Sequence, residues 1–188
     1  MKKDEWAYVL DYLPKGKQEV PPHKRKPVAQ VVGENFFTLL EVTPREGMAL
    51  ENGDKIYIGE DTREHIDHID RRIKYEWLTP TAKSELPYVL RTAVEDHEQR
   101  FLEFYNTAGI ISTRQHKLET LPKIGKKSRE EILEEREIEK FESFQDMRQR
   151  VRGIDPVKAV SDKILEEMKG ESKYLLFTPM LDKKDRRR

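Results

Sequence analysis

The sequence predicts an α+β protein of two domains, a small amino-terminal β-barrel followed by an all-α domain. Two observations predict this class. Short segments rich in aromatic and β-branched residues, separated by glycine and proline turns, fill the first 78 residues. From residue 79 onward, apolar residues recur at intervals of three and four, the spacing of one helix face. We expect a barrel over 1–78, connecting helices over 79–111, a helical domain over 112–170, and a short strand with a basic tail over 171–188.

Composition limits the classes of function. The 188 residues include 36 basic and 36 acidic side chains, so only local clustering, and not net charge, can argue for a nucleic-acid partner. The absence of cysteine excludes disulfides, thiol catalysis and cysteine-bound zinc. We find no signal-peptide core and no apolar run of membrane length, and we expect a cytoplasmic protein without a membrane partner. The charged fraction of 38% fits a thermophilic protein, although it fits any helix-rich, solvated surface as well.

Five segments of the first domain have the character of strands. Gly33 and Asn35 supply turn residues between the second and third of them, which favours a hairpin. Five short strands with a long first loop favour a closed or partly open barrel, of which the OB-fold is the commonest nucleic-acid-binding form. An SH3-like barrel or an open meander fits nearly as well. The predicted strands are 5–13, 28–33, 35–43, 54–59 and 72–77.

The loop between the first two strands is basic and punctuated by prolines. A charge run is ordinarily a solvated loop, but in an OB-like barrel this loop is one of those that face the ligand. Its cations are therefore candidate nucleic-acid contacts. Aromatic residues of the strands could stack on bases, although a place in the core is the preferred interpretation for each. The candidate cations are Lys15, Lys17, Lys24, Arg25 and Lys26.

The second half of the chain is predicted as a series of helices. A kink or a break is expected at Pro87, and a continuous helix from 88 to 108. Ser112-x-x-Gln115 matches a capping box and predicts a helix over 113–120. Three more helices follow, and the second of them is capped at Ser143. Residues 174–178 could form a strand that returns to the barrel.

A tight hydrophobic turn, Leu121-Pro122-Lys123-Ile124-Gly125, separates two of these helices. Glycine lets the backbone turn sharply and approach a ligand. The helix that follows begins with unpaired N–H groups at its positive dipole end, which together make an anion site. An ordinary turn of an all-α domain is the alternative interpretation. The candidate phosphate-binding residues are Lys123, Ile124, Gly125, Lys126, Lys127 and Arg129.

A second turn of similar sequence, Arg152-Gly153-Ile154-Asp155-Pro156, also precedes an apolar helix, which indicates an internal duplication. The pair resembles the tandem helix-hairpin-helix domains of DNA uptake and repair proteins. That motif usually has glycine on both sides of the central isoleucine. Lys123 replaces the first glycine of the first turn, and Asp155 replaces the later glycine of the second. We therefore expect the first turn to bind phosphate and the second to be its structural partner.

Together with the barrel and the segment Tyr75-Glu76-Trp77-Leu78-Thr79, these turns make most of the chain resemble an archaeal family of conserved hypothetical proteins. That family is known as domain of unknown function 655 and is described as predicted RNA-binding. The resemblance implies a fold, and RNA ahead of DNA as the ligand. It implies no enzymatic activity.

We therefore expect a non-catalytic, sequence-tolerant nucleic-acid-binding protein. A protein-interaction adaptor in a nucleic-acid-processing assembly is the alternative, because balanced charge suits that role equally well. We find no catalytic motif and predict no cofactor. His65-x-x-His68, with Asp61, Asp67 and Asp70 nearby, is the one metal-like pattern. A solvated surface segment is the preferred interpretation of it, so we predict no metal site.

Overall fold

The computed structural model describes residues 3–179. The chain divides into two units. The N-terminal unit comprises Met1–Val89 and Met168–Arg188, and the C-terminal unit comprises Leu90–Glu167. Within residues 3–179, no helix combines the length and the apolar character that crossing a membrane requires. The predicted basic tail, 183–188, lies outside the described residues.

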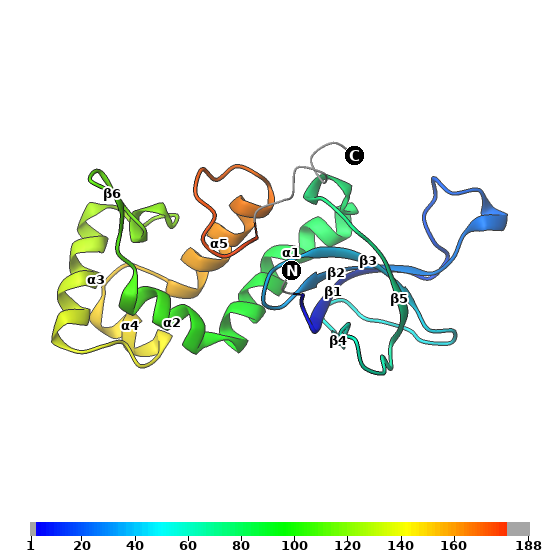
Figure 1. Ribbon diagram of the computed structural model, residues 1–188, viewed down its shortest axis with the longest axis horizontal. Helices are drawn as coiled ribbons and strands as arrows, with labels where there is room; N and C mark the ends of the chain where they lie inside the picture. Colours follow the sequence, from blue (N-terminus) through cyan, green and yellow to red (C-terminus); the bar gives the residue numbers. More distant parts are fainter. Residues whose placement is uncertain (1–2, 180–188) are drawn as a thin grey trace. The chain divides into compact units, whose positions relative to one another are not determined.

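The N-terminal unit is built on a curled sheet of five antiparallel strands in the order β4-β1-β2-β3-β5 (Figure 1). Register shifts interrupt β1 between Val9 and Asp11 and β3 between Glu41 and Val42. Such bulges bend a strand and increase its twist, which explains the curl. Since β4 and β5 are the two edges, the sheet is a half-barrel. The strands are β1 (Trp6–Leu13), β2 (Val28–Gly33), β3 (Leu39–Pro44), β4 (Lys55–Tyr57) and β5 (Ile66–Arg72).

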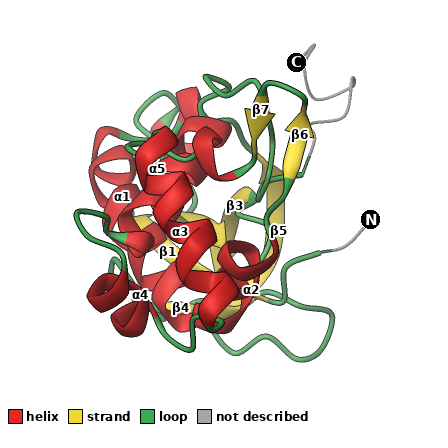
Figure 2. Cartoon of the chain, turned by 90° about the vertical axis from the view of Figure 1, so that its left-hand side faces the viewer, coloured by secondary structure: helices red, strands yellow, loops and turns green. Residues whose placement is uncertain are grey.

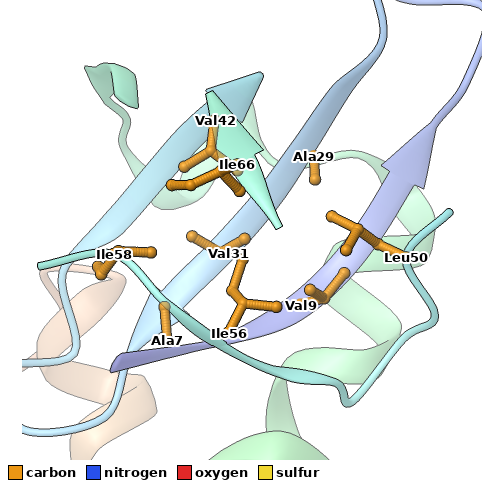
Figure 3. Close-up of a cluster of buried hydrophobic side chains, with 9 residues drawn as sticks. All are labelled: Ala7, Val9, Ala29, Val31, Val42, Leu50, Ile56, Ile58 and Ile66. Carbon is orange, nitrogen blue, oxygen red and sulfur yellow. The ribbon is translucent and has the colours of Figure 1, made fainter. Parts of the chain in front are cut away.

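One face of this sheet encloses an apolar core (Figure 3). Alternate residues of each strand point to that face, as the period of a strand requires. Leu50 and Ile58, from the segments that flank β4, close over the same cluster. Ile66 from the edge strand β5 is fully buried in it. The cluster consists of Ala7, Val9, Ala29, Val31, Val42, Leu50, Ile56, Ile58 and Ile66.

The opposite side of the sheet carries a buried polar network that holds the start of the first helix, α1 (Pro80–Asp96). The Gln30 side chain accepts from the Thr79 N–H at 2.8 Å and donates to the Trp77 carbonyl at 3.0 Å. The Thr79 hydroxyl donates to Asp11 at 2.6 Å and also caps the helix by accepting from the Ala82 N–H. The side-chain amide of the fully buried Gln30 is thus hydrogen-bonded to the backbone of the residues that lead into α1.

Two strand predictions are wrong. The fifth strand is β5, over 66–72 instead of 72–77, and Tyr75–Trp77 form a 3-10 turn, η2. As an edge strand, β5 buries few residues and tolerates the charged residues of its sequence IDHIDRR. Because so few of its residues are apolar, a search for hydrophobic alternation does not detect it. Residues 174–178 form bends and no strand. Phe177 is nevertheless buried, whereas Leu175 is 40% exposed.

The C-terminal unit contains the end of α1 and four further helices, with a small hairpin of β6 and β7 (Figure 2). Helix α1 runs through Pro87 without interruption, and the predicted helix over 88–108 breaks instead at His97, where φ is −112° and ψ is 35°. The elements after α1 are α2 (Glu98–Thr107), β6 (Ile110–Ser112), β7 (Gln115–His116), η3 (Leu118–Thr120), α3 (Lys126–Ile138), α4 (Phe144–Arg150) and α5 (Pro156–Met168).

The helix predicted over 113–120 does not form, because Gln115–His116 are strand β7 and Leu118–Thr120 are the 3-10 turn η3. Ser112 pairs with Gln115 across the small hairpin and accepts from the Arg114 N–H, so it makes a local turn instead of capping a helix. The Ser143 cap of α4 is confirmed, with its side chain accepting from the Asp146 N–H at 2.9 Å.

Candidate nucleic-acid interface

The first hairpin, which we define as residues 121–125, is a tight turn anchored from below. Leu121 and Ile124 are buried, and the Ile124 N–H donates to the Leu121 carbonyl at 3.2 Å. Lys123 lies between them with its side chain exposed and its backbone at a φ of 65°, in the left-handed region. Two apolar anchors therefore hold a strained turn that directs a cation to solvent.

Helix α3 begins directly after this hairpin. Gly125 precedes it in an extended conformation, φ −91° and ψ −172°, and no side chain caps the helix. The first intrahelical bond runs from the Arg129 N–H to the Gly125 carbonyl at 2.9 Å. The earlier N–H groups of a helix have no intrahelical acceptor. Lys126 and Lys127 are exposed at this uncapped end, so the start of α3 combines free amide donors with two cations.

Arg129 does not extend this cationic surface. Its guanidinium lies 3.1 Å from a Glu119 carboxylate oxygen and 2.9 Å from one of Glu130, and its Nε is buried without a partner in the described residues. These two carboxylates therefore offset the positive charge of the guanidinium. Among the predicted residues of the first hairpin, the structure brings together Lys123, Lys126 and Lys127 as exposed cations and assigns Arg129 to an internal ion-pair network.

The second hairpin, residues 151–155, repeats the conformation of the first. Gly153 has a φ of 76° at the position that corresponds to Lys123, and each hairpin is followed by a helix of 13 residues. The start of α5, the helix that follows this hairpin, differs from the start of α3. The Asp155 carboxylate accepts from the Lys158 N–H at 3.2 Å and so occupies the anion position of α5. The Arg148 guanidinium lies 3.3 Å from the same carboxylate.

Asp155 is therefore a fixed anion of the protein itself. Burial raises the pKa of its carboxyl group, but the Lys158 amide and the Arg148 charge outweigh burial and leave the pKa below its usual value. Pro156 follows and has no N–H to offer. The second helix start is thus already occupied by a carboxylate, whereas the first is open.

The two hairpins lie side by side on a shared cavity of about 150 Å³. Backbone and side chains from both turns line it, together with one face of α5. Its charges are mixed, since Lys158 lies 2.9 Å from a carboxylate oxygen of Asp162. The lining residues are Pro122, Lys123, Ile124, Gly153, Ile154, Asp155, Lys158, Ala159 and Asp162.

The equivalence of the two turns predicts opposite effects of substitution at Lys123 and Gly153. A Cβ added at Gly153 meets no atom within 4 Å, so Gly153→Ala should be destabilising through backbone strain alone, by about 1 to 2 kcal/mol. Lys123→Gly should relieve the same strain and be stabilising by at most about 1 kcal/mol. Urea unfolding measures both. A neutral Gly153→Ala would contradict the shared left-handed geometry.

His116 supports the first hairpin from the preceding segment. The imidazole Nδ1 of His116 accepts from the Leu118 N–H at 3.1 Å, and the backbone N–H of His116 donates to the Glu119 carboxylate. Burial, together with the charges of Arg136 and Arg129, lowers the pKa of this imidazole. Protonation would also remove the acceptor that Leu118 uses.

This lowered pKa predicts a pH-dependent stability. Because the unfolded state binds the proton more readily, the contribution of His116 is present above the ordinary histidine pKa of about 6.5 and is lost as pH falls below it. Urea unfolding at pH 7.5 and pH 5.5 should therefore show a less stable C-terminal unit at the lower pH. The control His116→Asn keeps an acceptor for Leu118 without titrating, and should flatten the difference. An equal pH dependence in that variant would contradict the assignment.

The predicted contacts of the β1–β2 loop divide into two groups. The loop projects from the sheet with the 3-10 turn η1 (Pro22–Lys24) at its far end (Figure 1). Lys15, Lys24 and Lys26 are exposed there. Lys17 instead forms an ion pair with the buried Glu41. The Arg25 guanidinium donates to the backbone carbonyls of Val20 and Gln18 at 2.7 and 2.9 Å and braces the loop.

The two histidines of the metal-like pattern lie just before and within β5, and both make local hydrogen bonds. His68 lies 2.8 Å from an Asp67 oxygen and 3.2 Å from one of Asp70, and these contacts, opposed by slight burial, raise the pKa of its ring. His65 contributes its carbonyl to the Arg45 N–H. Within residues 3–179 no group of three histidine or acidic side chains has the arrangement of a metal site.

These observations define a class of protein: an α+β chain in which a curled five-stranded sheet is followed by helices that carry two equivalent turns. The chain belongs to the family described as "Protein of unknown function (DUF655)", whose match spans residues 3–179.

Two relatives are archaeal proteins. The chain is 46% identical to "Uncharacterized protein MJ0038" of Methanocaldococcus jannaschii over 178 residues, which cover 94% of this chain and 80% of that protein. It is similar to the crystal structure of Af1531 from Archaeoglobus fulgidus, with a TM-score of 0.88 and 46% identity over 94% of this chain and 100% of that one. The likeness therefore extends over nearly the whole chain and both units.

Proposed function

We propose that this protein is a non-catalytic, sequence-tolerant nucleic-acid-binding protein. In this proposal, its two turn-and-helix units are a tandem helix-hairpin-helix, and the first hairpin grips the phosphate backbone. One observation carries the proposal. Two turns of the same conformation lie together, and only the first combines an uncapped helix start with exposed lysines. Asp155 fills the corresponding position of the second.

The contacts follow from the chemistry of a helix start. Amide groups near Gly125 to Lys127 would donate to phosphate oxygens, and the lysines would supply charge. Amides and lysines address the backbone and carry no base readout, so binding is expected to be sequence-tolerant and to weaken steeply with salt. We prefer RNA over DNA as the ligand because of the family resemblance, since these residues do not distinguish the two.

The N-terminal unit would add a second contact area. In this proposal, the half-barrel is OB-like, and its β1–β2 loop faces the ligand through Lys15, Lys24 and Lys26. Lys17 and Arg25 are assigned to holding that loop in shape, because their side chains are bound within the protein. Their replacement should therefore affect stability more than the salt dependence of binding.

Fluorescence anisotropy with labelled single-stranded RNA, duplex RNA and duplex DNA across a salt series tests this proposal. We expect binding to all three backbones, RNA the tightest, with affinity falling linearly in logarithmic plots against salt. The absence of binding to every ligand at low salt would overturn the proposal. A preference for duplex DNA would overturn its RNA component alone.

The adaptor alternative has one structural observation in its favour. Two large hydrophobic side chains of the C-terminal unit, Ile110 on β6 and Ile138 at the end of α3, are 75% and 79% exposed, and apolar contacts with a partner could cover them. Protein partners would be sought at these positions if the nucleic-acid titrations show no binding.

A further inference from the structure

A cluster of aromatic and basic side chains lies in the N-terminal unit, and within it Trp77 and Arg71 are exposed while the other members are partly buried. It is formed where β5, η2 (Tyr75–Trp77), the start of α1 and the residues after α5 come together. We call it the Trp77 cluster, and it consists of Tyr75, Trp77, Arg71, Lys74, Lys83 and Lys169.

Trp77 is held rigidly and yet exposed. Its carbonyl accepts from Gln30, which fixes the main chain against the sheet, while 42% of the residue remains accessible to solvent. The Arg71 guanidinium carbon lies 5.3 Å from the ring centroid, and the Lys74 Nζ lies 5.9 Å from it. A large aromatic side chain is thus presented to solvent between two cations.

Tyr75 has the same kind of surroundings. The ammonium groups of Lys83 and Lys169 lie 5.5 and 5.4 Å from its ring centroid. Lys83 also donates to the Glu76 carbonyl at 3.2 Å, so a backbone oxygen and not a carboxylate is its hydrogen-bond partner there. The rings of Tyr75 and Trp77 are therefore each bordered by two cationic side chains.

The other tryptophan of the chain shows what distinguishes this cluster. Trp6 is exposed to a similar extent, 40%, and Lys55 lies 5.9 Å from its ring. Lys55 forms a salt bridge to Glu34 at 2.6 Å, however, and Lys3 forms one to Glu60. Carboxylates therefore neutralise the cations of the Trp6 region.

In the Trp77 cluster, Arg71 lies 2.8 Å from a carboxylate oxygen of Glu41, which is itself buried. Glu41 also binds Lys17, so its single charge is set against two cations. Lys74, Lys83 and Lys169 add positive charge around the rings. Trp77 is consequently an exposed ring bordered by the cationic groups of Arg71 and Lys74.

We propose that the Trp77 cluster is a base-stacking site for a single-stranded segment of nucleic acid. An unpaired base would lie against Trp77, and the adjoining phosphates would meet the lysines. Stacking on exposed aromatic rings, with cations along the backbone, is how proteins bind single strands without reading sequence. In a duplex the faces of the bases are stacked on one another, so they are not available to an aromatic side chain of the protein. The inference goes beyond the proposed function, because the hairpin accepts a backbone whether its bases are paired or not.

The presence of only two tryptophans allows a direct test. In Trp6→Phe, Trp77 is the sole tryptophan, and its fluorescence is followed during titration with oligouridylate. A matched oligomer of sugar and phosphate without bases and an RNA duplex serve as controls. We expect oligouridylate to quench Trp77, and neither control to do so. In Trp77→Phe, the emission of Trp6 should not change.

A second readout is affinity. Trp77→Ala should weaken binding of oligouridylate about tenfold or more, with a smaller effect on the duplex, and Trp77→Phe should retain most of the affinity. Thermal unfolding of each variant establishes that it is folded. Unchanged Trp77 emission, or equal quenching by the oligomer without bases, would overturn the proposal, as would equal affinities of the wild type and a folded Trp77→Ala.

The hairpin and the cluster are separable in this experiment. Lys126→Glu/Lys127→Glu in the Trp6→Phe background should keep the quenching at saturation, because the cluster belongs to the other unit. If the charge reversal changes neither the quenching nor the binding of the nucleic-acid backbone, the hairpin is not the phosphate-binding site, and the assignment of the cluster stands. Backbone binding without quenching would overturn the cluster and leave the hairpin.

Discussion

Lys126→Glu/Lys127→Glu is expected to lower the affinity for RNA about 100-fold or more at low salt. The two lysines are exposed at the uncapped start of α3, so their reversal replaces attraction with repulsion at the point where a phosphate would sit. If each lysine neutralises one phosphate, the slope of log affinity against log salt should also fall by roughly 1.4 to 1.8. Anisotropy titrations over a salt series measure both quantities.

Lys140→Glu is the matched control for the single change Lys126→Glu. Its side chain is exposed just beyond the opposite end of α3, about 20 Å along the helix axis from Lys126. Both variants alter net charge equally, so a local contact predicts a large loss only for Lys126→Glu. Equal losses would mean that the overall field of the protein, and not the hairpin, attracts the ligand.

Glu41→Ala is expected to be destabilising for the N-terminal unit by about 2 to 3 kcal/mol. The carboxylate is buried and binds Lys17, Arg71 and Gln30, the last at 3.1 Å. Removal of one partner from a buried ion pair costs about 3 to 5 kcal/mol in general. We expect less here, because Arg71 is half exposed and water can solvate it. Urea unfolding of the variant measures the loss.

The titration of Glu41 gives this prediction a second check. Burial raises the pKa of the carboxyl group, but hydrogen bonds from Lys17, Arg71 and Gln30 outweigh burial and hold the pKa below its usual value. Its contribution is therefore present above the ordinary pKa and is lost as pH falls through the lowered one. Glu41→Gln should be less destabilising than Glu41→Ala and should remove that part of the acid sensitivity. A Glu41→Ala variant as stable as the wild type would contradict the role of the network.

The sheet and the later helices could be predicted because their patterns are local. Strands β1 to β4 have apolar runs bounded by turn residues, and α3 and α5 follow glycine- or proline-marked turns. Strand β5 could not be placed correctly, because its stability comes from pairing with β3 and from the single buried Ile66. Tertiary contact there overrides a sequence of mostly charged residues.

The helix predicted over 113–120 shows the opposite error. Ser112-x-x-Gln115 satisfies a capping pattern, yet those two residues pair across a hairpin. Burial of Leu118 and the bond between the Lys117 N–H and the Gly109 carbonyl hold the segment in that form. A capping pattern reports only local preference, and these contacts come from packing that no local pattern contains.

The candidate hairpin could be located from glycine, isoleucine and lysine spacing alone. Its electrostatics could not be. The ion pairs of Arg129 with Glu119 and Glu130 depend on which side chains meet in space. The exposure of Trp77 was equally hidden, since an aromatic residue in a strand-like segment is more often buried. Sequence patterns indicate which residues suit a chemistry, and packing decides which remain available.

The measurement that tests the central claim most directly is an amide chemical-shift titration of the ¹⁵N-labelled protein with a short RNA at low salt. Our account predicts that the amides of Ile124, Gly125, Lys126 and Lys127 shift and saturate together, while the Asp155-capped start of α5 changes little. Shifts confined to the second hairpin, or absent from both while RNA binds elsewhere, would contradict the assignment of the first hairpin as the phosphate grip.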